Sequence, residues 1–173
     1  MSAGLRRDHH IAPRAVTGAT YQGQTAHAAV YTWARDVQTS KEMVVPIASD
    51  QPKDLSCIVG CAVLTGAGAV LHTAGVRAGQ SVAVFGAGGV GISAIQAAAI
   101  VGAYPIIAVD LDDKKLEFAK LFGATHTINA AKTDAVQAVK DLTGGKGADF
   151  VIEAVGTDAT YNQVKDMVRL EGL

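Results

Sequence analysis

The feature that most constrains this chain is a glycine-rich segment, Gly86–Gly91, which directly follows the apolar run Val82–Phe85. It reads Gly-Ala-Gly-Gly-Val-Gly, a GxGxxG pattern, and each glycine meets a steric demand of a strand-turn-helix unit that binds a dinucleotide. Gly86 permits the tight turn, Gly88 lets the backbone approach a pyrophosphate, and Gly91 lets the helix lie close to its strand. The helix N-terminus then offers free amides to the phosphates. Taken alone, the pattern also fits a plain turn or the similar loop of methyltransferases.

An acidic residue stands where such a unit needs one. Asp110 lies nineteen positions after Gly91, at the end of the apolar run Ile106–Val109. A carboxylate there would accept both hydroxyls of an adenosine ribose and would repel a 2′-phosphate, which favours NAD over NADP. The alternative role, an N-cap for a helix over 113–122, can be filled by Leu111–Asp113.

From Ser81 onward, strand-like and helix-like patterns alternate, which predicts an α/β fold with a doubly wound parallel sheet of Rossmann type. The expected strands are 82–85, 106–109, 127–129 and 150–153, and the expected helices are 90–101, 113–122, 134–142 and 159–170. Six strands in the order 3-2-1-4-5-6 complete such a sheet, so we expect a truncated one. The fourth strand would then be an edge, and an apolar edge favours self-association.

The first 51 residues lack such a pattern. Glycines and prolines interrupt short β-prone runs, such as Ala28–Trp33 and Met43–Ile47, that have no local partners. From Pro52 an apolar run extends to Gly75 and predicts one buried helix. We therefore expect two parts, a remnant of another domain with its linker over 1–51 and an incomplete NAD-binding domain over 52–173.

Composition narrows the possible partners. The formal net charge is −1 and the pI about 6.5, which gives no positive field for nucleic acid or anionic lipid. The longest apolar stretch, Cys57–Val76, is interrupted by four glycines and His72, so we expect no membrane span and a cytoplasmic location. Cys57 and Cys61 are the only cysteines, too few for a disulfide framework or a complete thiolate metal site.

The segment Gly60–Ala69, followed by Val76–Ser81 and the glycine-rich turn, resembles the zinc-dependent medium-chain alcohol dehydrogenases. The Thr-Gly-Ala-Gly-Ala run within it further resembles the benzyl or aryl alcohol branch. The resemblance extends from about Tyr31 to Gly172. It implies NAD as cofactor, zinc in the whole enzyme, and oxidation of an alcohol to an aldehyde or ketone by hydride transfer.

Residue by residue, the resemblance implies that Cys61 is a ligand of the catalytic zinc and that Thr65 touches the nicotinamide in the catalytic site. It implies that Asp110 and Lys115 reach the adenosine ribose and that Val90 packs under the nicotinamide. The cofactor groove would be completed by the glycine-rich turn and the segment after the fourth strand, with Gly86, Gly88, Gly89, Gly91, Val155 and Gly156.

The family takes its other two zinc ligands, a cysteine and a Gly-His-Glu histidine, from an N-terminal GroES-like domain. The five histidines, His9, His10, His27, His72 and His126, stand in no such motif. Because a catalytic zinc needs three protein ligands, we expect an NAD-binding part of an alcohol dehydrogenase that is inactive in isolation. Two alternatives stay open: a non-catalytic NAD-binding or sensing module, and a zinc-free quinone-type reductase, which would lack Cys61.

Overall fold

The computed structural model describes residues 20–21, 24–25, 44–170 and 172. The chain divides into two units, Met1–Gln51 and Pro52–Leu173. In the first unit, strands β1 (Thr20–Tyr21) and β2 (Gln24–Thr25) pair antiparallel. Residues 44–47 form no strand, so the β-prone run there does not become one. The run Ala28–Trp33 lies outside the described residues.

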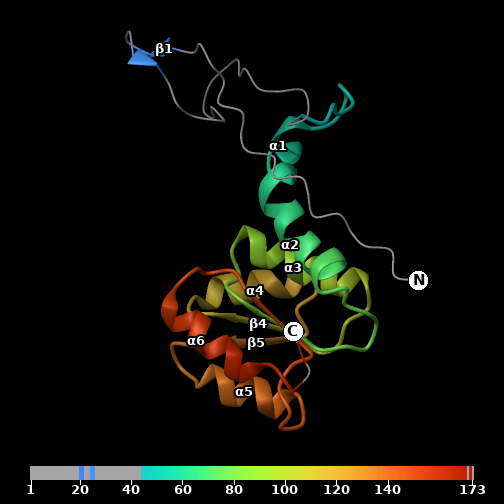
Figure 1. Ribbon diagram of the computed structural model, residues 1–173. Coiled ribbons are helices and arrows are strands. Elements are labelled where there is room, and N and C mark those ends of the chain that lie inside the picture. The colour runs from blue at the N-terminus through green and yellow to red at the C-terminus, as the bar shows by residue number, and fades with distance from the viewer. Residues whose placement is uncertain (1–19, 22–23, 26–43, 171, 173) are drawn as a thin grey trace, which may run out of the picture. The chain divides into compact units, whose positions relative to one another are not determined.

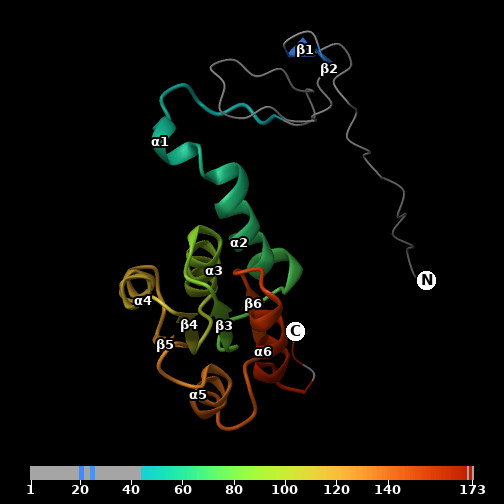
Figure 2. The same cartoon turned by 90° about the vertical axis from the view of Figure 1, so that its left-hand side faces the viewer.

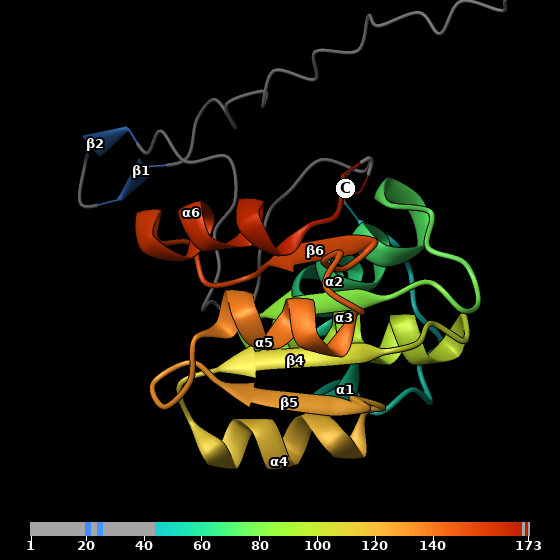
Figure 3. The same ribbon diagram turned by 90° about the horizontal axis from the view of Figure 1, so that it is seen from below.

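The second unit is built on a four-stranded parallel sheet (Figure 3). In chain order its strands are β3 (Val82–Phe85), β4 (Ile106–Asp110), β5 (His126–Asn129) and β6 (Phe150–Glu153). Their order across the sheet is β5-β4-β3-β6, with every neighbouring pair parallel. This is the 3-2-1-4 portion of the doubly wound order. The predicted α/β fold and its strand order are confirmed.

Helices cover both faces of the sheet (Figure 2). Because side chains alternate along a strand, Val82 and Val84 of β3 enter one core while Ala83 and Phe85 enter the other. The first core includes residues of α3 (Gly89–Ile100) and α4 (Asp113–Leu121), and the second includes residues of α5 (Ala135–Leu142) and α6 (Asp158–Met167). The observed ends of these helices lie within three residues of the predicted ones, and the start of α4 and the end of α5 coincide with them.

The helix predicted between Pro52 and Gly75 is present, but the prediction that it is buried is wrong. Residues 53–73 form one helical run in four pieces: α1 (Lys53–Ser56), the π-helical η2 (Val59–Val63), α2 (Leu64–Gly68) and the π-helical η3 (Ala69–Thr73). Only Gly66 and Val70 of this run are buried. The run lies against α3 from η2 to η3 (Figure 1), but most of its residues are exposed or half-buried.

An 18-residue window of this 21-residue run has a mean hydropathy of 1.8, so by length and composition the run would also pass as a membrane span. That indication is weak, since the core helices of water-soluble proteins meet the same criterion. One face of its second half packs against α3. Gly66 lies so close to α3 that a β-carbon there would overlap the carbonyl oxygen of Val90 and lie 2.8 Å from the Ser93 β-carbon.

A polar clamp joins β3 and β6 at the amino end of the sheet. Asp149 Oδ2 accepts hydrogen bonds from the Ser81 amide at 2.7 Å and hydroxyl at 2.6 Å, and Arg169 Nε lies 2.9 Å from Oδ1. Burial tends to raise the pKa of Asp149, but the bonds from Ser81 and the charge of Arg169 outweigh it and hold that pKa below its ordinary value. The clamp lies at the opposite end of the strands from the glycine-rich turn.

Candidate functional site

A pocket of about 640 Å³ opens at the carboxyl ends of β3, β4 and β6. Strand order reverses here, because the chain passes from β3 to β4 on one side and returns to β6 on the other. Ligands of doubly wound sheets bind at this point. The residues that line the pocket are Phe85, Gly86, Gly88, Asp110, Leu111, Asp112, Lys115, Ala130, Ala154, Val155, Thr157, Ala159, Thr160 and Gln163.

The glycine-rich turn has the geometry that its sequence requires. Gly86 has a φ of +97°, a conformation that favours glycine. A β-carbon at Gly91 would overlap the carbonyl oxygen of Gly86, so only glycine lets α3 start this close to β3. At Gly88, in contrast, a β-carbon would meet no atom within 4 Å. The open space at Gly88 and the absence of a side-chain cap on α3 leave the first amides of the helix available to an anion.

Asp110, at the end of β4, is tied to this turn. Its Oδ2 accepts a hydrogen bond from the Ala87 amide at 2.8 Å, and its Oδ1 accepts bonds from the amides of Leu111 and Asp112 at 2.8 and 3.0 Å. Lys115 Nζ lies 4.0 Å from Oδ2. The N-cap of α4 is Asp112, whose side chain accepts from the Lys114 amide, so Asp110 does not cap that helix.

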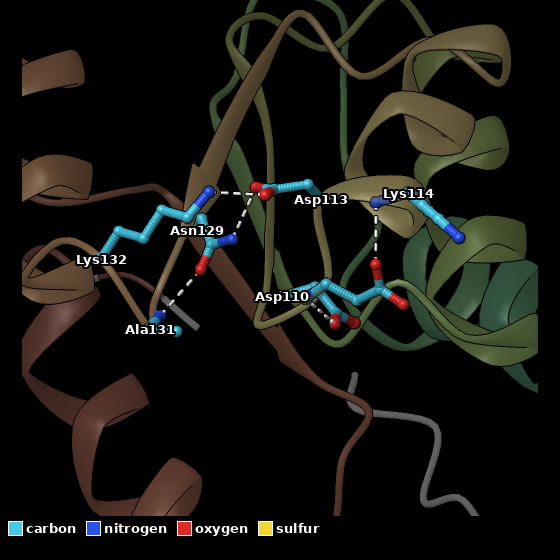
Figure 4. A network of polar contacts seen from close by, with 7 residues as sticks. Asp110, Asp113, Lys114, Asn129, Ala131 and Lys132 are labelled. Atoms are coloured by element: carbon cyan, nitrogen blue, oxygen red, sulfur yellow. Dashed lines mark hydrogen bonds and ion pairs between the residues drawn. The ribbon is translucent and has the colours of Figure 1, made fainter.

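A second polar network lies beside Asp110 (Figure 4). Asp113 accepts hydrogen bonds from Asn129 Nδ2 and from Lys132 Nζ, which ties the start of α4 to the end of β5. The bonds from Lys132 and Asn129 lower the pKa of Asp113. None of these three residues lines the pocket.

On the far side of β3, Glu153 organises the turn between β6 and α6. Its Oε1 accepts hydrogen bonds from the Val155 amide at 2.9 Å, the Gly156 amide at 3.0 Å and the Thr160 hydroxyl at 2.9 Å. Burial tends to raise the pKa of Glu153, but these bonds outweigh it and hold the pKa below its ordinary value. Sequence reasoning missed this role. The only signal was an acid that ends an apolar strand three positions before a glycine.

The structure brings five of the expected cofactor residues together around the pocket: Gly86, Gly88, Asp110, Lys115 and Val155. The other expected cofactor residues, Gly89, Val90, Gly91 and Gly156, lie in the first turn of α3 or in the β6–α6 turn without lining the pocket.

Cys61 and Thr65, both exposed, lie outside the pocket on η2 and α2. Their neighbours Ala62 and Gly66 lie against the first turn of α3, at Gly89 and Val90. This part of the helical run therefore borders the glycine-rich turn. Within the described residues, no group of three His, Cys, Asp or Glu side chains could hold a metal ion, so they do not form the three-ligand site that a catalytic zinc requires.

Strand order, glycine-rich turn and pocket together define a Rossmann-type domain. Comparison with known proteins identifies its family. The zinc-binding dehydrogenase family profile matches residues 89–173. S-(hydroxymethyl)glutathione dehydrogenase of Saccharomyces cerevisiae is 42% identical over 131 residues, and class-3 alcohol dehydrogenase of Oryza sativa subsp. japonica is 42% identical over 128. Each alignment covers 73% of this chain and 32% of the relative.

Among solved structures, benzyl alcohol dehydrogenase from Acinetobacter calcoaceticus is 40% identical with a TM-score of 0.71, over 74% of this chain and 35% of that one. The chain belongs to the zinc-dependent medium-chain alcohol dehydrogenase family, and it spans about a third of the length of the curated relatives it matches. The 73% of this chain that the alignment covers corresponds to about 126 of its 173 residues. Wherever a continuous stretch of that length begins, it includes residues 48–126. Cys61, the glycine-rich turn and Asp110 all fall within that part.

Proposed function

We propose that this chain binds NAD in the pocket at the carboxyl ends of β3, β4 and β6. The observation that carries the proposal is the pairing of Asp110 with an open glycine-rich turn across one pocket wall. Asp110 accepts the hydroxyls of the adenosine ribose, and Lys115, 4.0 Å from that carboxylate, lies within reach of the same sugar. The carboxylate also disfavours a 2′-phosphate, so NAD is preferred over NADP.

The glycine-rich turn would hold the pyrophosphate. At Gly88 no β-carbon stands in its way, and the first amides of α3 face it with the positive end of the helix dipole. Val90 and Thr65 would contact the nicotinamide, because the helical run that carries Thr65 borders the first turn of α3. When bound, NAD supplies the hydride acceptor, and the protein residues supply its position.

We further propose that the chain is the NAD-binding part of an alcohol dehydrogenase that oxidises an alcohol to an aldehyde or ketone. Family membership supports this, as do the alcohol and S-(hydroxymethyl)glutathione dehydrogenases that it resembles. Cys61 is the proposed zinc ligand of the whole enzyme. Because the described residues do not complete a zinc site, the 173-residue chain alone is proposed to bind NAD without oxidising alcohols.

Titration of the purified chain with NADH, followed by nucleotide fluorescence, tests the binding site. NADH should bind saturably, and ADP-ribose, which carries the adenosine and pyrophosphate but no nicotinamide, should displace it. Failure of ADP-ribose to compete would place the nucleotide elsewhere. In a separate assay, alcohol-dependent NADH formation by the zinc-loaded chain would contradict the proposal that it is inactive alone.

A second candidate is a non-catalytic NAD-binding or sensing module, which the lack of a three-ligand cluster in the described residues favours. Zinc that the chain retains and that Cys61→Ser loses would favour the alcohol dehydrogenase over this module. Similarity also extends to a quinone oxidoreductase of Pseudomonas syringae, at 30% identity and a TM-score of 0.69. Cys61 argues against a zinc-free reductase of that type.

A further inference from the structure

The turn between β6 and α6 forms one wall of the pocket. Ala154, Val155, Thr157 and Thr160 all line it. The turn is also packed onto the glycine-rich segment, because Val155 Cγ2 would lie only 2.7 Å from a β-carbon at Gly86. Any change in the shape of the β6–α6 turn therefore alters both the pocket wall and the packing against the glycine-rich turn.

One carboxylate holds the turn at both ends. Glu153 binds the amides of Val155 and Gly156 at its start and the hydroxyl of Thr160 in the first turn of α6. Gly156, with a φ of +85°, provides the reversal that brings its amide back onto this carboxylate. Thr160 in turn forms the capping box of α6 with Thr157. Glu153 itself does not line the pocket.

We propose that Glu153 is a positioning residue for the bound nucleotide: it shapes the pocket wall across β3 from Asp110 without touching the ligand. The inference rests on the proposed NAD site. Parallel register supports it, since Phe85 of β3 pairs with Val109 on one side and with Glu153 on the other. Asp110 and Glu153 are thus the last residues of β4 and β6, the two strands that flank β3.

Glu153 acts through its hydrogen bonds to the protein and not through attraction or repulsion between its charge and the nucleotide. Three hydrogen-bond donors of the protein converge on the carboxylate, all from the turn and α6. No charged residue of the neighbouring elements β3 and α3 competes for the carboxylate, because these elements carry none. The charged residues of α6 are Asp158, Lys165 and Asp166. Glu153 therefore acts through the backbone that it holds.

The test compares Glu153→Gln with Asp149→Asn, two changes from acid to amide at opposite ends of β6. Both carboxylates accept backbone and hydroxyl hydrogen bonds, so both variants should melt at a lower temperature than the wild type. NAD affinity is measured by calorimetry well below the lowest melting temperature. Glu153→Gln should weaken NAD binding about tenfold, whereas Asp149→Asn should leave it within about twofold of the wild type.

Thr160 provides a second, milder probe. Thr160→Val removes one hydrogen bond to Glu153 and should weaken NAD binding by a few-fold, and Thr160→Ser, which keeps the hydroxyl, should restore it. Wild-type affinity in both Glu153→Gln and Thr160→Val, or an equal loss in Asp149→Asn, overturns the inference while the NAD site stands. No NAD binding by the wild type overturns the proposed function and this inference with it.

Discussion

Asp110 Oδ2 accepts a hydrogen bond from the backbone amide of Ala87 at 2.8 Å, which joins the end of β4 to the glycine-rich turn after β3. One carboxylate therefore both supports the glycine-rich turn and lines the pocket. Asp110→Asn keeps the size of the side chain but removes its charge. We predict that NAD binds about 10- to 100-fold more weakly to this variant, the range expected for the loss of hydrogen bonds to a charged acceptor.

The matched control is Asp113→Asn, an exposed carboxylate nearby that does not line the pocket. Its NAD affinity, measured in the same calorimeter, should stay within about twofold of the wild type. Equal losses in the two variants would mean that overall negative charge, and not contact at Asp110, governs binding.

Two glycines of the turn should respond to alanine in opposite ways. Gly91→Ala places a methyl group on the carbonyl oxygen of Gly86 and should lower the free energy of unfolding by about 1–3 kcal/mol or more. Gly88→Ala meets no protein atom within 4 Å, so denaturant unfolding should change little, yet NAD binding should fall because the methyl group occupies the pyrophosphate position. Undiminished NAD affinity in Gly88→Ala would argue against that position.

Side chains of the helical run 53–73 differ widely in burial, so alanine substitutions along it should differ in their effect on stability. Val70 is fully buried and Leu64 is 65% exposed. Val70→Ala should lower the free energy of unfolding by about 1–3 kcal/mol, and Leu64→Ala by less than about 0.5 kcal/mol, although it removes more carbon atoms. Urea unfolding of the two variants measures the difference. A larger loss for Leu64→Ala would show that this face of the helix is covered.

Asp149 should make stability depend on pH. Its pKa is lower in the folded state than its ordinary value near 3.8, so its ionised form contributes stability that is present above that value. The contribution is lost as pH falls through the folded pKa. We predict that Asp149→Asn is about 1–3 kcal/mol less stable than the wild type at pH 6. The gap should close below pH 3.8, and a constant gap would contradict this account.

Much of this fold follows from local sequence patterns. The strand of Val82–Phe85 and the turn after it were predictable because their steric demands are local, and Asp110 because its distance from the turn is fixed by one helix and one strand. Burial along residues 53–73 was not predictable, because an apolar composition does not say which face has a neighbour. Glu153 was missed because its role depends on hydrogen bonds to Val155, Gly156 and Thr160, which no spacing rule describes.

The central claim is that Asp110 and the glycine-rich turn form an NAD site. Calorimetric titration of the 173-residue chain with NAD and with NADP tests it most directly. We expect saturable NAD binding with one site per chain and at least about tenfold weaker binding of NADP, because the Asp110 carboxylate would repel the 2′-phosphate. Equal affinity for the two nucleotides, or no binding of NAD, would contradict it.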